Sequence, residues 1–187
     1  MKRLDEFGRM TLPHLTAAHT LAYWLVRNRS DAEDIVQEAF LRAYRGYDGF
    51  QGGDVRVWLL TIVRNTAYRW LSDRHRRSNV IAFDEAFNRY GDKESSEDEV
   101  ASSEPSPEDD LINSDNRHAI LQALGRLPAQ LREAIVLREI EGLSYREIAD
   151  VAGVKIGTVM SRLARSRSLL RASLAHLNNK TEAKGGL

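Results

Sequence analysis

Apolar side chains recur at three- and four-residue steps along most of the chain, a spacing typical of helices that bury one face. The alternation of apolar and polar residues that indicates a strand is scarcely present. In the amino-terminal half this pattern predicts three helices, over residues 13–27, 30–45 and 54–72. Ser30 and Glu33 have the spacing of a capping box at the start of the second helix. The third has the clearest core face, from Val55 to Leu71, so this half is expected to form a small helical domain.

The carboxyl-terminal half has the pattern of a four-helix domain. A short helix over residues 116–124 precedes a second helix, which Gly142 can end by adopting a left-handed conformation. Ser144 and Glu147 form a further capping box, and Gly153 allows a tight turn between the two helices of the segment SYREIADVAGVKIGTVMSRL. Two short helices joined in this way predict a helix-turn-helix.

An acidic stretch separates the two halves. Residues 84–115 contain twelve acidic and two basic residues, so the net charge is −10 there and +10 in the rest of the chain. The part KESSEDEVASSEPSPEDD has almost no large apolar side chain and includes Pro105 and Pro107, which predicts a flexible linker. The linker either acts as a solvated spacer or imitates nucleic acid over a basic surface. Without a partner, the two domains are expected to have no fixed mutual arrangement.

Composition narrows the class of protein. The 187 residues include no cysteine, which excludes disulfides and thiolate metal sites. The five histidines lack ligand spacing; His14 and His19, five residues apart, do not share a helix face. No apolar run is long enough to span a membrane. We therefore expect a soluble cytoplasmic protein without metal or cofactor.

Two helix faces in the amino-terminal half carry candidate binding residues. The first face combines Asp34, Gln37, Glu38 and Leu41, and is either solvated or a partner surface. The face opposite the core of the third helix presents Leu60, Thr61, Arg64, Asn65, Tyr68 and Arg69. Interleaved base, amide and aromatic groups suit single-stranded nucleic acid, in which guanidinium groups hold phosphates and a ring stacks on a base. Alternatively, Tyr68 packs locally and the arginines are solvated.

The last helix of the helix-turn-helix carries the third candidate surface. It presents Ser161, Arg162, Arg165 and Ser168 opposite its apolar face. These donors could reach base edges or phosphates if the helix lay in a major groove. The alternative is a helical hairpin whose arginines are solvated.

Four segments in order resemble the signatures of extracytoplasmic-function bacterial RNA polymerase sigma factors of the sigma-70 family. They are DAEDIVQEAFLRAYR, VWLLTIVRNTAYRWL, LPAQLREAIVLREIEGLSYREIA and GTVMSRLARSR. The resemblance implies a sigma-2-like domain, residues 1–83, which binds the clamp of the largest polymerase subunit and captures the melted minus-ten element. It also implies a sigma-4-like domain, residues 116–177, which binds the flap of the second-largest subunit and the minus-thirty-five duplex. A polar tail, residues 178–187, comes after it.

The resemblance also assigns residues to each contact. Those matching the clamp-binding helix are Asp34, Gln37, Glu38 and Leu41. Those matching the minus-ten contacts are Arg64, Asn65, Tyr68 and Arg69, followed by Arg74, Arg76, Arg77 and Asn79 in a loop implied to hold a flipped base. Those matching the minus-thirty-five contacts are Arg138, Lys155, Thr158, Met160, Ser161, Arg162 and Arg165. Met160 stands where the family often has a basic residue, which affects the base preference of this helix.

The implied function is that of a polymerase specificity subunit acting in a signal or stress response. No residues assemble a nucleophile, a base and an oxyanion site, so the chain is not expected to be an enzyme. The implied partners are core RNA polymerase, promoter DNA in duplex and melted form and, from the family alone, an anti-sigma factor; membrane insertion is not expected. The main alternative is a DNA-binding regulator that acts without polymerase as a dimer on paired half-sites.

Overall fold

The computed structural model describes residues 2–81 and 117–182, with side chains placed for residues 3–76 and 117–175. Within these ranges the backbone is helical or in turns and contains no strand, as the apolar pattern predicted. The predicted linker, residues 84–115, lies outside the described residues.

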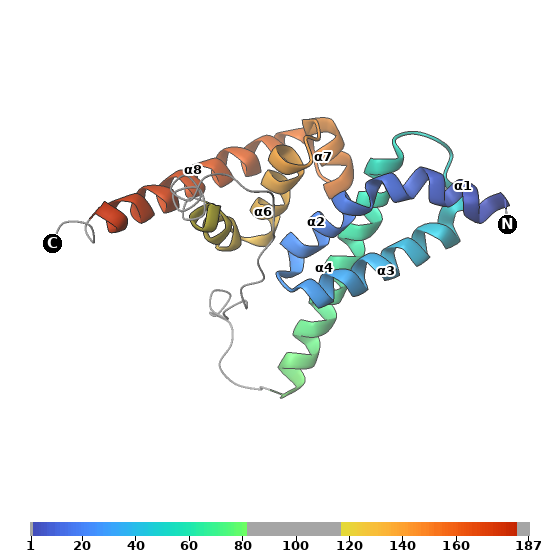
Figure 1. Cartoon of the computed structure of the whole chain (residues 1–187), viewed down its shortest axis with the longest axis horizontal. Helices are drawn as coiled ribbons and strands as arrows, with labels where there is room; N and C mark the ends of the chain where they lie inside the picture. Colours follow the sequence, from blue (N-terminus) through green and yellow to red (C-terminus); the bar gives the residue numbers. More distant parts are fainter. Residues whose placement is uncertain (1, 82–116, 183–187) are drawn as a thin grey trace, which may run out of the picture.

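Helices α1 to α4 form the amino-terminal body (Figure 1). Its elements are α1 (Lys2–Thr11), a 3-10 turn (Leu12–His14), α2 (Leu15–Val26), α3 (Arg29–Gly46), a second 3-10 turn (Tyr47–Gly49) and α4 (Val55–Ile81). Helices α2, α3 and α4 pack on one another through Ala18, Leu21, Ile35, Ala39 and Val63, all almost fully buried. The small alanine side chains let the helix backbones approach closely. Helix α1, which the sequence analysis did not predict, contributes the buried ring of Phe7.

Two predicted helix boundaries in this body were wrong. The N-cap of α3 is Asn28 and not Ser30: the Asn28 side chain accepts a hydrogen bond from the Asp31 amide at 3.0 Å, and its backbone is extended. Helix α4 continues to Ile81, so residues 74–79 are helical and do not form a loop. No proline or glycine interrupts this stretch, and an ion pair between Asp73 and Arg76 of the same helix supports it.

The carboxyl-terminal body contains the four predicted helices. They are residues 117–125, α6 (Ala129–Ile135) with a π-helical continuation (Val136–Ile140), α7 (Tyr145–Ala152) and α8 (Ile156–Glu182). The capping box of Ser144 and Glu147 is present, and Gly142 and Gly153 have φ of 68° and 64°. The last two helices therefore form the predicted helix-turn-helix. Helix α8 continues past residue 177, where the sequence analysis ended the domain.

The two bodies are in contact in this structure. Helix α2 packs on α6 and α4 packs on α7, and buried apolar residues of both bodies form one continuous cluster. Leu60 belongs to this cluster and is fully buried, although the sequence analysis placed it on the outer face of α4. The last turns of α4 and the carboxyl end of α8 project away from the contact (Figure 1).

Candidate nucleic-acid interface

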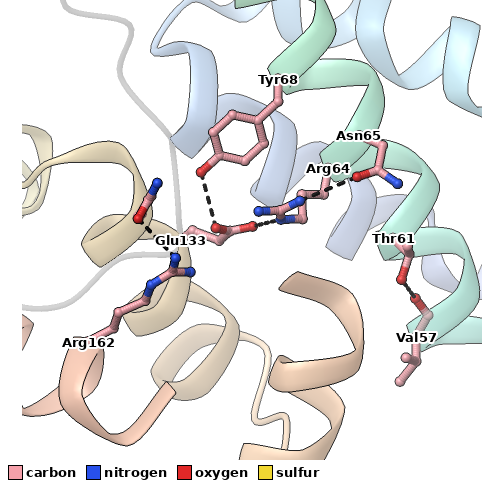
Figure 2. Close-up of polar contacts among 8 residues, drawn as sticks. Val57, Thr61, Arg64, Asn65, Tyr68, Glu133 and Arg162 are labelled. Carbon is pink, nitrogen blue, oxygen red and sulfur yellow. Dashed lines mark hydrogen bonds and ion pairs between the residues drawn. The ribbon is translucent and has the colours of Figure 1, made fainter. Parts of the chain in front are cut away.

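Two residues on the outer face of α4 converge on one carboxylate of the carboxyl-terminal body (Figure 2). Arg64 donates through Nε to Oε1 of Glu133, a residue of α6, and the Tyr68 hydroxyl donates to Oε2 of the same group at 3.1 Å. The Arg64 guanidinium also lies over the Tyr68 ring, 4.6 Å from its centroid. The Glu133 side chain is 1% exposed and that of Arg64 18%. Two residues predicted to read a melted strand are thus engaged within the protein.

Burial and charge at this contact affect the titration of two groups. Burial raises the pKa of the Glu133 carboxyl, while Arg64 and the hydrogen bond from Tyr68 act in the opposite direction. Burial and the Glu133 carboxylate raise the pKa of the Tyr68 hydroxyl. Tyr68 therefore remains a protonated donor at neutral pH.

The other predicted minus-ten residues extend along α4. Asn65 and Arg69 are exposed, and the Asn65 side-chain oxygen accepts a hydrogen bond from Arg64 at 3.3 Å. Arg74 pairs with Asp31 at 3.0 Å, and Arg76 pairs with Asp73. Arg77 and Asn79 lie in the last helical turns of α4, and their side chains lie outside the described residues. The structure thus arranges the predicted residues along one helix, with only part of the face open to solvent.

The first turns of α8 carry the predicted duplex-reading residues. Lys155, which immediately precedes the helix, Met160 and Arg165 are exposed. Ser161 is exposed and donates to the Thr158 carbonyl at 2.9 Å. These side chains form a solvent-facing surface, as a recognition helix requires.

Two predicted residues in the carboxyl-terminal body are held by protein contacts. Arg162 donates to the side chain of Gln130 on α6 at 2.9 Å, close to Glu133 (Figure 2). Arg138 donates to the Leu143 carbonyl at 2.8 Å and lies over the Tyr145 ring. Arg138 therefore stabilises the turn before α7 in this arrangement.

The opposite side of α8 is fixed to α6. Val159 and Leu163 are each 1% exposed, and the buried Ser166 hydroxyl hydrogen-bonds the Leu131 carbonyl at 2.8 Å. This packing sets which side chains of α8 face solvent.

The four predicted polymerase-binding residues lie together on α3. Asp34 and Gln37 are exposed, Glu38 pairs with Arg42 at 2.6 Å, and Leu41 is 52% exposed. An exposed leucine among acidic and amide groups provides an apolar contact and negative charge on one surface.

Charged residues at the contact between the bodies were missed by the sequence analysis. Arg132, next to Glu133 on α6, donates to the carbonyls of Trp24 and Leu25 at the end of α2, and burial lowers its pKa. Arg56 of α4 pairs with Glu141, donating also to its carbonyl at 2.8 Å. In sequence these residues read as ordinary surface charges of helices, and no local signal distinguishes them.

Two other features, a membrane-spanning helix and a metal-binding cluster, are absent from the residues that the structure describes. Within residues 2–81 and residues 117–182, no helix is both long and apolar enough to cross a bilayer. The described side chains form no cluster of three histidine, aspartate or glutamate residues that could hold a metal ion.

Comparison with protein families gives two matches, one in each body. Residues 11–77 match the family model of sigma-70 region 2, and residues 117–170 match that of sigma-70, region 4. The ECF RNA polymerase sigma factor SigE of Mycolicibacterium smegmatis is 38% identical over 181 residues, which cover 97% of this chain and 65% of that protein. The ECF RNA polymerase sigma-E factor of Escherichia coli K12 is 38% identical over 145 residues, 75% of this chain and 72% of that protein.

Solved structures with a similar fold include two from complexes. The sigma factor RpoE, in complex with the anti-sigma factor NepR from Bartonella quintana, has a TM-score of 0.68 and 29% identity, covering 91% of this chain and 98% of that chain. CnrH, in complex with the cytosolic domain of CnrY, has a TM-score of 0.62 and 25% identity, covering 92% of this chain and 90% of that chain. Both similarities therefore extend over the two bodies.

Proposed function

Because the chain belongs to the extracytoplasmic-function RNA polymerase sigma factors of the sigma-70 family, we propose that it directs core RNA polymerase to a specific set of promoters and initiates transcription there. The observation that carries the proposal is the presence of two matched helical bodies in one chain, each with its own candidate DNA-reading helix. One helix, α4, combines arginine, asparagine and tyrosine. The other, α8, presents polar and basic side chains from a helix-turn-helix.

In this proposal the amino-terminal domain, residues 1–83, captures the melted minus-ten strand. Tyr68 stacks on an exposed base, Asn65 hydrogen-bonds a base edge, and Arg64 and Arg69 hold phosphates. Further proposed minus-ten contacts come from the last turns of α4 and are Arg74, Arg76, Arg77 and Asn79. Part of the proposed contact surface is already exposed in the free chain, at Asn65 and Arg69.

The carboxyl-terminal domain, residues 116–177, reads the minus-thirty-five duplex. Arg165 and Ser161 are exposed near the start of α8, where the residues of a recognition helix contact base edges. Lys155, Thr158, Met160 and Arg162 flank them, and Arg138 contacts the DNA backbone. Met160 is 53% exposed and offers a base an apolar contact in place of a charged one.

Core polymerase is the proposed macromolecular partner of α3. Asp34, Gln37, Glu38 and Leu41 bind the clamp of the largest subunit, with acids opposing basic groups and Leu41 as the apolar anchor. The carboxyl-terminal domain binds the flap of the second-largest subunit. An anti-sigma factor is a further proposed partner, which is supported by the anti-sigma factor in the complex of the similar RpoE structure.

The chain acts in this proposal as a specificity subunit in the cytoplasm and contributes no catalytic groups of its own. Catalysis would belong to the polymerase that the chain recruits.

Purification with core RNA polymerase and transcription from genomic DNA test the proposal together. We expect a stable complex, and transcription start sites that share two conserved elements at fixed spacing. Failure to bind core polymerase, combined with dimeric binding to paired half-sites, would favour an independent DNA-binding regulator.

A further inference from the structure

We propose that Ile156 and Met160 of α8 recognise thymine methyl groups in the minus-thirty-five duplex, so that thymines at defined positions of that element determine which promoters the chain selects. This inference rests on the proposed function and deepens it, because it names the base chemistry that the duplex-reading helix recognises. We call these two residues the apolar pair.

The solvent-facing side of the first turns of α8 carries two adjacent rows of residues at four-residue steps. The apolar row consists of Ile156, Met160 and Ala164. The polar row beside it consists of Gly157, Ser161 and Arg165. All of these residues are exposed, and the apolar pair is 45% exposed at Ile156 and 53% exposed at Met160. The apolar row is therefore separate from the core face of the helix.

The position of the apolar pair distinguishes it from ordinary surface residues. Apolar residues that are exposed singly are common on protein surfaces and need no explanation. The members of this pair lie about one helical turn apart on the same side of α8. Ile156 is also the first residue of α8, and the first turns of a recognition helix are the part that contacts base edges. When the helix lies in the major groove, the apolar pair therefore faces the bases.

The charge around the apolar pair matches a nucleic acid. Residues 155–171 include five basic residues and no acidic residue. Lys155 precedes the pair and Arg165 follows it, and both side chains are exposed. Ammonium and guanidinium groups at these positions can contact phosphates beside the groove, which fixes the register of the helix on the duplex. The bases of a DNA duplex are therefore the partner that this apolar face fits.

The chemistry of the major groove identifies the base. Among the base edges of unmodified DNA, the methyl group of thymine is the apolar group, and the other groups are hydrogen-bond donors and acceptors. Polar side chains in the same turns of α8 are engaged within the protein. Ser161 donates to the Thr158 carbonyl at 2.9 Å, and Arg162 donates to the Gln130 side chain at the same distance. Recognition by the first turns of α8 therefore depends in part on apolar contact, which thymine supplies.

Helix geometry sets the spacing of the thymines. Residues four positions apart lie about 6 Å apart along a helix axis, and successive bases are stacked about 3.4 Å apart. The apolar pair should therefore reach methyl groups roughly two base-pair steps apart. The unbranched side chain of Met160 can adapt to the position of a methyl group. Gly157, next to Ile156, has open space where a Cβ would lie, so the helix backbone can approach the bases closely.

Removal of single methyl groups from the DNA tests the inference. The full-length chain in complex with core RNA polymerase first selects the minus-thirty-five element from promoter duplexes that are randomised there. Each thymine of the selected element is then replaced by uracil, which lacks the methyl group and keeps the same hydrogen-bonding groups. We expect the affinity of the parent to fall about fourfold at a thymine that the apolar pair contacts, since one apolar methyl group is lost.

Variants of the apolar pair assign each methyl group to a side chain. Met160→Ala should bind thymine and uracil equally at one position, and Ile156→Ala should do so at another. Met160→Leu keeps an apolar side chain and should retain the preference for thymine. Leu169→Ala is the matched control, because Leu169 is an exposed apolar residue farther along α8, and it should leave every effect of uracil unaltered.

Several results would overturn the inference. One is a selected element without thymine, and another is equal affinity of the parent for thymine and uracil at every position. A loss on uracil that persists in both alanine variants would show that another residue contacts the methyl groups. Should circular dichroism show that Met160→Ala is unfolded, Met160→Gln supplies the same comparison. Failure to bind core polymerase would instead refute the proposed function, and the uracil comparison with the chain alone would still decide the methyl contact.

Discussion

Tyr68 has two properties that substitution can separate. Its hydroxyl donates to Glu133 at 3.1 Å, and its ring lies 4.6 Å from the Arg64 guanidinium carbon. Tyr68→Ala removes both the hydroxyl and the ring, whereas Tyr68→Phe removes only the hydroxyl. In the complex with polymerase, the ring is the group that would stack on a base of the melted minus-ten strand. We therefore expect the alanine variant to be defective in strand capture and the phenylalanine variant to resemble the parent.

The size of the expected defect is set by the loss of stacking. A base stacked on an aromatic side chain contributes about 1 to 3 kcal/mol, which corresponds to a loss of roughly 5- to 150-fold in strand affinity. In the free chain, both substitutions also remove the hydrogen bond that Tyr68 donates to the Glu133 carboxylate at the contact between the two bodies, which contributes about 1.5 to 3 kcal/mol.

Open-complex formation on duplex and premelted templates measures this difference. The Tyr68→Ala complex should form open complexes more slowly on duplex DNA, and premelting should rescue only part of the defect, because the ring also holds the captured strand. Affinity of the carboxyl-terminal domain for the upstream duplex should not change. Equal behaviour of Tyr68→Ala and the parent on both templates would refute the assignment of this ring to strand capture.

Three further predictions concern other surfaces. Asp34→Arg/Glu38→Arg should weaken assembly with core polymerase at least about tenfold, since like charges then meet, as measured by titrating labelled chain with core enzyme. Arg165→Ala should lower affinity for the minus-thirty-five duplex by about 1 to 3 kcal/mol and relax the preference at one base pair, read on singly substituted duplexes. Ser144→Ala should lower the free energy of unfolding by about 1 kcal/mol in urea titrations. Hydrogen bonds with the side chain and the backbone of Ser144 lower the pKa of Glu147 below its ordinary 4.5, so the cap contributes stability above that pH and loses it as pH falls through the lowered pKa. The variant should show a weaker pH dependence, because the backbone amide at position 144 still donates to the Glu147 carboxylate.

Each of these predictions has a control or an opposing outcome. Asp5→Arg/Glu6→Arg makes the same charge change at exposed positions of α1 and should leave core affinity unaltered. Arg171→Ala removes an exposed guanidinium farther along α8 and should leave base preference unaltered. Unchanged core affinity in the α3 variant, with intact helicity, would mean that this face is only solvated surface. If Arg165→Ala leaves the base preference unchanged, the prediction for the duplex-reading helix is contradicted. If Ser144→Ala keeps the full pH dependence of the parent, the prediction for the helix cap is contradicted.

Local sequence determined the helices and their sharpest boundaries. The capping box of Ser144 and Glu147 and the left-handed turns at Gly142 and Gly153 are where the sequence predicted them. These features depend on residues a few positions apart, so short-range pattern is sufficient to specify them. The same reasoning failed for the start of α3, because Asn28 and Ser30 are both suitable caps and only the backbone geometry selects Asn28.

The environment of each helix face was decided by tertiary structure. Periodicity placed Leu60, Arg64 and Tyr68 on the outer side of α4, but it could not indicate that a second body covers that side. The partner of Arg64 is 69 residues away in sequence, across the acidic segment. In sequence, Glu133 follows the ordinary pattern of a helix surface, yet its side chain is 1% exposed. A charge becomes buried only when another part of the chain supplies its partner, and that pairing has no signature within either helix.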